Sequence, residues 1–257
     1  PHVVGDTMFN APTPFARLRL LLLVPLLALT AVFAQAEDLT EDDVNQMVRN
    51  YILENPEIIM EAISILQERE QAAQQASQNE LIASVSDQLT NADNDPVGGN
   101  PNGDITLVEF FDYNCGYCKR ASQTVKALTE ANPNLRVVYK EWPILTETSV
   151  TAARVSLAIS ELYPDQYQAY HDALLARPGS LGQNSEVWEV VDSLGLDRAE
   201  LEEETKADWV QQTLASNRSL AQQLNITGTP TFVVGTEILR GAFPQADIQA
   251  AIDASME

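Results

Sequence analysis

The two cysteines of this chain stand close together, as Cys115-Gly116-Tyr117-Cys118, between an apolar run and a helix-forming stretch. Residues 105–111 are typical of a strand buried on both faces, and residues 119–131 have helical character. When a Cys-x-x-Cys pair opens a helix, its first thiol lies at the exposed N-terminus, where unpaired N–H groups and the helix dipole favour a thiolate. The pattern predicts a redox-active dithiol in which Cys115 attacks and Cys118, one turn further along, resolves.

The competing interpretation of the pair is half of a zinc site. Structural zinc needs four ligands, and the chain has no further cysteine and only two histidines, His2 and His171. Neither pattern nor composition supplies the missing ligands. We therefore expect a dithiol without a metal and without a cofactor.

The first 36 residues have the pattern of a cleaved secretory signal. Arg17 and Arg19 precede the apolar run 20–33, which ends at the small-residue site Ala34-Gln35-Ala36. This run is shorter than the ~20 residues of a membrane span, although an uncleaved anchor remains the alternative. Residues 1–7 lack signal character, and we expect translation to start at Met8.

The charge balance is strongly acidic. The chain carries 15 Lys and Arg against 37 Asp and Glu, a formal net charge of -22. Nucleic acids and anionic membranes are disfavoured as partners by this charge. The simplest interpretation of this net charge is that it keeps the protein soluble, and an acidic docking surface is the alternative.

The leader that follows the signal, residues 37–90, is predicted to be helical. Thr40 is a predicted N-cap, Asn55 and Pro56 have the pattern of a second helix start, and residues 67–80 are rich in Gln, Ala and Glu, as in a semi-rigid spacer. Apolar residues recur at helical spacing in two stripes: Val44, Met47, Val48, Tyr51 and Ile52, then Ile58, Ile59, Ala62, Ile63 and Leu66. Association with copies of itself and packing against the rest of the chain both remain open for these stripes.

Apolar residues resume at Leu81, Ile82, Val85 and Leu89. Residues 91–104 then contain several Pro and Gly, and we predict a linker and a domain boundary there. The catalytic domain is predicted to span residues 105–257.

Glu109 is the one ionisable residue of the run 105–111, and it shares a face with Leu107 and Phe111. Burial there would raise its pKa and let it exchange a proton with the buried thiol of Cys118. The alternative is a structural carboxylate that pairs with a buried lysine or a backbone group.

The rest of the domain alternates strands and helices. Residues 135–141 form a predicted second strand at βαβ spacing, residues 146–224 a long helical insertion, and residues 231–241 a hairpin that precedes a last helix at 246–256. A cis Thr229-Pro230 bond would suit a proline directly before a pairing strand. Trp142, Trp188 and Trp209 are interpreted as core or domain-contact residues, and His171 as solvent-facing or hydrogen-bonded rather than catalytic.

Several motifs together resemble the DsbA family of thioredoxin-fold periplasmic oxidoreductases. They are Glu109-Phe110-Phe111, Cys115-Gly116-Tyr117-Cys118-Lys119, the helical insertion, and Gly228-Thr229-Pro230-Thr231-Phe232, which cover about residues 104–257. The leader, with Asp42-Asp43-Val44 and Asn55-Pro56-Glu57, is similar to the N-terminal region of ScsC-like and Com1-like proteins. Some members of that group are trimeric disulfide isomerases.

The resemblance implies an α/β thioredoxin fold with a helical insertion (DsbA-like), preceded by an N-terminal α-helical oligomerisation segment at residues 37–90. Cys115 would be the nucleophile, Cys118 the resolving thiol, and Thr229-Pro230 a cis-proline loop opposite them. A substrate peptide would lie against that loop and against Gly116 and Tyr117 as an added strand.

The sequence departs from the oxidase pattern because no histidine stands between the cysteines, which predicts a less depressed pKa for Cys115 and a weaker oxidant. Gly116-Tyr117 resembles the dipeptide of dimeric disulfide isomerases. We therefore expect a periplasmic disulfide isomerase or reductase, a homotrimer, whose partners are cysteine-containing secreted clients and a membrane redox protein. A dithiol oxidase is the nearest alternative, and a holdase chaperone or a copper-sequestering protein is the alternative from another class.

Overall fold

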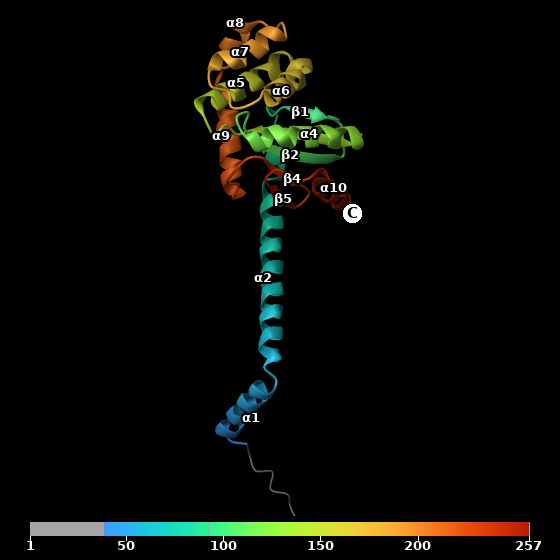
Figure 1. Cartoon of the computed structure of the whole chain (residues 1–257), viewed down its shortest axis with the longest axis vertical. Coiled ribbons are helices and arrows are strands. Elements are labelled where there is room, and N and C mark those ends of the chain that lie inside the picture. Colours follow the sequence, from blue (N-terminus) through green and yellow to red (C-terminus); the bar gives the residue numbers. More distant parts are fainter. Residues whose placement is uncertain (1–38, 92, 257) are drawn as a thin grey trace, which may run out of the picture. The chain divides into compact units, whose positions relative to one another are not determined.

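The computed structural model describes residues 39–91 and 93–256 (Figure 1). Its strands are β1 (Val97–Gly99), β2 (Ile105–Phe111), β3 (Leu135–Glu141), β4 (Thr231–Val234) and β5 (Glu237–Arg240). Its helices are α1 (Glu41–Glu54), α2 (Glu57–Ser84), α3 (Ser86–Thr90), α4 (Gly116–Ala131), α5 (Glu147–Leu162), the 3₁₀ helix η1 (Pro164–Gln166), α6 (Tyr167–Ala176), α7 (Asn184–Ser193), α8 (Arg198–Glu204), α9 (Asp208–Gln223) and α10 (Gln245–Ala254). Within the described residues, no helix combines the length and apolarity that crossing a bilayer requires. The predicted signal segment lies outside the described residues.

The chain separates into two compact units, one ending at Met60 and the other beginning at Glu61. Helix α1 of the first unit begins at the predicted cap: the Asp43 backbone N–H donates to Thr40 Oγ1 over 3.2 Å, and the Thr40 N–H donates back to Asp43 over 3.1 Å. This reciprocal pair is a capping box. The second helix starts one residue later than predicted, at Glu57, and Asn55 ends α1 by donating its N–H to the Tyr51 carbonyl over 2.9 Å.

A five-stranded sheet in the order β1-β3-β2-β4-β5 forms the centre of the second unit. Strands β2 and β3 are parallel and are joined through α4, whereas the other neighbours pair antiparallel. Both strands have the predicted bounds, and β4 and β5 form the predicted hairpin through Gly235 and Thr236. The predicted fold class, a thioredoxin fold with a helical insertion and N-terminal helices, is confirmed. Helices α5 to α8 of the insertion gather beside one another (Figure 1).

Each face of the sheet carries its own apolar cluster. The first contains Leu107, Phe111, Val137, Tyr139 and Phe232 of the sheet together with residues of α4, α5, α6, α7 and α10. The second contains Val108, Phe110, Val138 and Val233 with Ile82, Val85 and Leu89, and also Leu220 and Leu224 near the end of α9. Helices therefore cover both faces, which is why β2 is apolar at nearly every position.

The stretch expected to be a linker is partly structured. Residues 97–99 form β1, which pairs with β3, and Asp95 is buried in an ion pair with Lys140 at 2.6 Å. Gly99 allows the close approach, because its φ is +67° and a Cβ there would lie 2.4 Å from the Leu135 carbonyl oxygen. Glycines that suggest a linker in the sequence thus permit an edge strand in the structure.

Candidate active site

Cys115 is the N-cap residue of α4, at the end of the loop that follows β2. Its N–H donates to the Asp112 carbonyl over 2.9 Å, and its sulfur accepts the N–H of Cys118 over 3.4 Å. The helix therefore points its unpaired N–H groups at this sulfur, as the sequence predicts.

The pKa of Cys115 is lowered to about 5. The largest cause is a hydrogen bond from the Cys118 side chain, and the Thr229 side chain and backbone N–H groups of α4 add to it against the opposing effect of burial. The missing histidine had suggested a smaller depression of this pKa. Other donors around the sulfur stabilise the thiolate instead.

The sulfur of Cys115 is also less exposed than a helix-terminal thiol would suggest, since the residue is 7% exposed. The reason is the loop opposite: as a thiol, Cys115 Sγ donates to the Thr229 carbonyl over 3.2 Å. The Thr229-Pro230 peptide bond in this loop is cis. Gly116 and Tyr117 are exposed beside the dithiol, and the Arg120 guanidinium lies 4.3 Å from the centre of the Tyr117 ring.

Cys118 is fully buried one turn into α4. Burial is the main reason that its pKa lies far above the ordinary value, and the hydrogen bond to Cys115 and the charge of Glu109 raise it further. The two thiols are thus opposites: one ionises readily at neutral pH, and the other needs a proton acceptor before it can attack.

Glu109 is buried on the face of β2 that carries Leu107 and Phe111, as predicted. Its pKa is raised to about 8, mainly by burial and secondly by the charge of Cys115. Among the described residues, its Oε1 atom has no hydrogen-bond partner. The buried lysine of the alternative interpretation, Lys140, lies on the opposite face of the sheet with Asp95.

Two polar residues of the loop before Cys115 hold this loop in place. Sequence reasoning missed both, because the only signal they carry is the turn-forming tendency of Asp and Asn. Asp112 accepts the N–H groups of Ile144 and Leu145 over 2.8 and 3.0 Å. Asn114 accepts the Leu181 N–H over 2.5 Å and donates to Thr146 Oγ1 over 2.6 Å. These bonds tie the loop both to the end of β3 and to the insertion.

A second set of buried polar side chains surrounds Tyr113. Tyr113 Oη is 2.8 Å from Ser156 Oγ, 3.2 Å from Glu141 Oε1 and 3.3 Å from His171 Nδ1. Burial lowers the pKa of His171 to about 3, so its ring is neutral. His171 is therefore hydrogen-bonded in the core, one of the two interpretations that the sequence left open.

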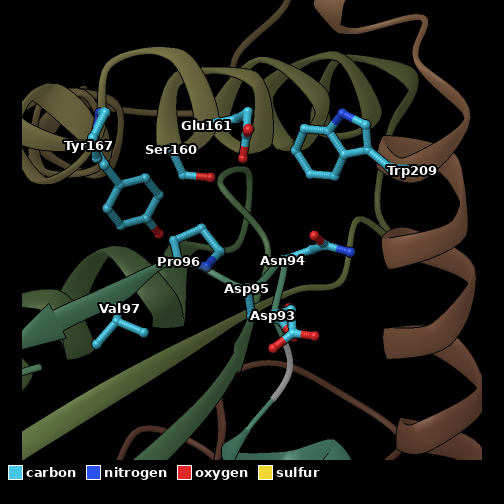
Figure 2. Close-up of a pocket in the computed structure, with 10 residues that line it drawn as sticks. Asp93, Asn94, Asp95, Pro96, Val97, Ser160, Glu161, Tyr167 and Trp209 are labelled. Atoms are coloured by element: carbon cyan, nitrogen blue, oxygen red, sulfur yellow. The ribbon is translucent and has the colours of Figure 1, made fainter.

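An acidic hollow of about 210 Å³ lies away from the cysteines (Figure 2). In the view, Ser160 and Glu161 face the Asp93–Pro96 loop, and the Trp209 ring closes one side. Of the three tryptophans, Trp142 and Trp188 are buried as predicted, whereas Trp209 is half-buried at this hollow. Within the described residues, His, Cys, Asp and Glu form no group of three or more that could hold a metal ion.

Two family models match the chain. The DSBA-like thioredoxin domain matches residues 106–253, and the copper resistance protein ScsC N-terminal domain matches residues 41–73. Among solved structures, a thioredoxin-like oxidoreductase from Silicibacter pomeroyi is 43% identical over 66% of this chain and 96% of that one, with a TM-score of 0.63. Proteus mirabilis ScsC in a transitional conformation is 30% identical over 84% of this chain and 96% of its own, with a TM-score of 0.65.

Curated relatives are more distant. The Na(+)/H(+) antiporter NhaA 1 of Salinispora arenicola is 29% identical over 162 residues, and the chain spans 24% of the length of that protein. The thiol:disulfide interchange protein DsbA of Bordetella pertussis is 27% identical over 148 residues, which cover 55% of this chain and 68% of that one. On the family match and on the likeness to the Silicibacter structure, this chain belongs to the DSBA-like thioredoxin family.

Proposed function

We propose that this chain is a periplasmic thiol:disulfide oxidoreductase that exchanges disulfides with secreted proteins through Cys115 and Cys118. The observation that carries the proposal is the contrast between the two thiols: the pKa of Cys115 is lowered to about 5, whereas burial raises that of Cys118. A pair of this kind combines a nucleophilic thiolate with a protonated resolving thiol one helical turn away.

In the proposed mechanism, the Cys115 thiolate attacks one sulfur of a client disulfide. A mixed disulfide forms, and the other client sulfur leaves as a thiolate that takes a proton from solvent. Glu109 then accepts the proton of Cys118, whose sulfur attacks Cys115 and expels the second client thiolate. The client gains two electrons and the protein becomes a disulfide. In isomerisation, the thiolate of a different client cysteine attacks the client sulfur of the mixed disulfide instead, which forms a new client disulfide and releases Cys115 as a thiolate.

The Thr229-Pro230 loop is proposed to hold the client backbone, with Gly116 and Tyr117 on the other side of the sulfur. The Thr229 carbonyl lies 3.2 Å from Cys115 Sγ, and a hollow of about 240 Å³ is lined by residues 227–231 with Arg240 and Gly241. An extended peptide beside this loop would bring its own sulfur to Cys115.

The direction of exchange is proposed to be isomerisation or reduction, carried out by a homotrimer. The leader supports this, because its apolar side chains are exposed in the single chain: Val48 is 52% exposed, Ile59 46% and Ile63 41%. Stripes rich in isoleucine favour assemblies of three or more helices. Association would place several Cys115 thiolates around one client and hinder re-oxidation by a membrane partner.

An oxidase is the second candidate, and the lowered pKa of Cys115 favours it. Stabilisation of the thiolate makes the reduced form more stable and the disulfide a stronger oxidant. It also helps an isomerase to stay reduced, so the thiol chemistry alone fits both directions.

Trapping of clients tests the exchange mechanism. Cys118→Ala should accumulate mixed disulfides with secreted clients on non-reducing gels, whereas Cys115→Ser should form none. Ser160→Ala, a change on the helical insertion, serves as the control and should behave as wild type. Trapping by Cys115→Ala and not by Cys118→Ala would reverse the two roles, and trapping by neither would refute the proposal.

A further inference from the structure

A hollow that contains no cysteine lies where the end of β3 meets helices α5 and α9. Its cavity volume is about 230 Å³. Most of its wall is apolar, formed by Trp142, Pro143, Val150, Leu214 and Ala215. Arg154 of α5, with Gln211 and Arg218 of α9, completes the lining. We call this cavity the Trp142 hollow.

Two hydrogen-bond donors in this wall have no acceptor among the described residues. They are the indole Nε1 of Trp142 and the Nε of Arg154, and both atoms are shielded from water. Trp142 as a whole is 7% exposed. A buried donor without a partner is unfavourable, and native structures keep few of them. Two unpartnered donors in the wall of one hollow indicate that a ligand with a hydrogen-bond acceptor binds there.

The charges of the hollow also lack a counterpart. Arg154 and Arg218 take part in none of the ion pairs of the described residues, which involve Lys140, Arg177, Arg198 and Lys206. Two arginines without an ion-pair partner among the described residues therefore line this mainly apolar cavity.

We propose that the Trp142 hollow binds a carboxylate carried on a short apolar stem. The guanidinium of Arg154 offers paired N–H donors that match a carboxylate, and Arg218 adds a second positive charge at the wall. The indole and aliphatic side chains receive the stem. A phosphate or another fully hydrated anion would leave this apolar wall uncovered, which is why the structure favours an amphipathic acid.

Two sources present this chemistry: a free monocarboxylate, and the C-terminal carboxylate of a peptide that ends in an apolar residue. The probe for the first is phenylacetate, with neutral phenylacetamide as its matched control. The probe for the second is acetyl-Gly-Gly-Phe with a free carboxylate, against the same peptide with an amidated end. The dithiol plays no part in this proposal.

The experiment is a titration of the full ¹⁵N-labelled protein, followed by the indole N–H signals of its three tryptophans. Trp142→Phe assigns the signal of Trp142. We expect phenylacetate, the free peptide or both to move this signal, and the neutral probes to leave it in place. Movement with only one acid identifies the source of the ligand.

Substitutions at the wall complete the test. Arg154→Gln and the exposed Arg218→Gln should each weaken binding of the acid by about tenfold, because a hydrogen bond to a charged group contributes on the order of 1.5–3 kcal/mol. Arg198→Gln, which removes a surface arginine paired with Glu202 on α8, is the control and should bind as wild type. Equal binding of the neutral probes, no movement of the Trp142 signal with either acid, or unchanged affinity in both wall variants would overturn the proposal.

Discussion

Replacement of Glu109 by glutamine should slow the step in which Cys118 attacks the mixed disulfide. The change removes a proton acceptor at nearly constant shape, next to a thiol that Glu109 helps to keep protonated. General bases of this kind contribute roughly 10²- to 10⁴-fold to a rate, and we expect a loss of at least about tenfold at pH 7.

The pH dependence follows from the pKa of Glu109, which is raised to about 8. Roughly a tenth of the carboxyl groups are ionised at pH 7 and roughly a hundredth at pH 6. The resolving rate of the wild type should therefore rise with pH up to about 8. Because the charge of Cys115 contributes to the raised pKa and is absent from a mixed disulfide, the midpoint of the resolving step should lie somewhat lower.

The same shift predicts a change in stability. Glu109 ionises near pH 4.5 in the unfolded chain and near 8 in the native protein, so between these values the native state holds more protons. Stability then falls as the pH rises through this window. The conversion gives an upper estimate of about 3 kcal/mol lost at pH 7 and about 5 kcal/mol above pH 8. Glu109→Gln should recover much of this loss at pH 8 and change little at pH 4.

The assay is acid quench and mass spectrometry of a preformed mixed disulfide between pH 6 and 9, with urea denaturation at pH 4, 7 and 8. Glu141→Gln is a matched control, because Glu141 is also a buried carboxyl with a raised pKa but bonds to Tyr113 instead of neighbouring the dithiol. It should alter stability and leave the resolving rate unchanged. A Glu109→Gln protein with the wild-type rate at every pH would refute the proton role of Glu109.

Two further predictions concern the loop and the leader. Thr229→Val removes a hydroxyl group that lowers the pKa of Cys115, so this pKa should rise. The reduction potential, measured against glutathione, should then become more negative by about 30 mV. An unchanged potential would contradict the contact between the Thr229 side chain and the Cys115 sulfur. Val48→Ser, Ile59→Ser and Ile63→Ser together should give a monomer in light scattering that loses scrambled-ribonuclease refolding but still oxidises dithiols. Gln71→Ser with Gln74→Ser is the control, and equal isomerisation by the triple variant would leave the oxidase as the better account.

The structure also limits how the leader can be shortened. Removal of residues 37–90 would take away Ile82, Val85 and Leu89, which belong to the apolar cluster under the sheet. Such a deletion would expose Val108 and Phe110 and destabilise the fold. A loss of isomerase activity could then come either from lost assembly or from unfolding. Substitution of the exposed side chains avoids this problem, because Val48, Ile59 and Ile63 belong to neither cluster.

Local rules were enough to predict much of this protein. The bounds of β2 and β3, the N-cap at Thr40, the hairpin through Gly235 and Thr236, and the place of Cys115 at a helix start all depend on residues a few positions apart. Hydrogen bonds within one turn and alternation along one strand are properties of short segments, which a sequence displays directly. The burial of Glu109 followed from the same alternation.

Contacts between distant segments were decided only by the tertiary structure. The Thr229 carbonyl reaches Cys115 across 114 positions, and Asp95 from a presumed linker neutralises Lys140 across 45. Tyr113, Ser156 and His171 meet in the core, and Trp142 joins Arg154 and Arg218 around one hollow. No periodicity in the sequence records these pairings, because each depends on how helices pack on the sheet. Packing also set the pKa of Cys115, since the donors around its sulfur come both from its own helix and from a loop that only the fold brings near.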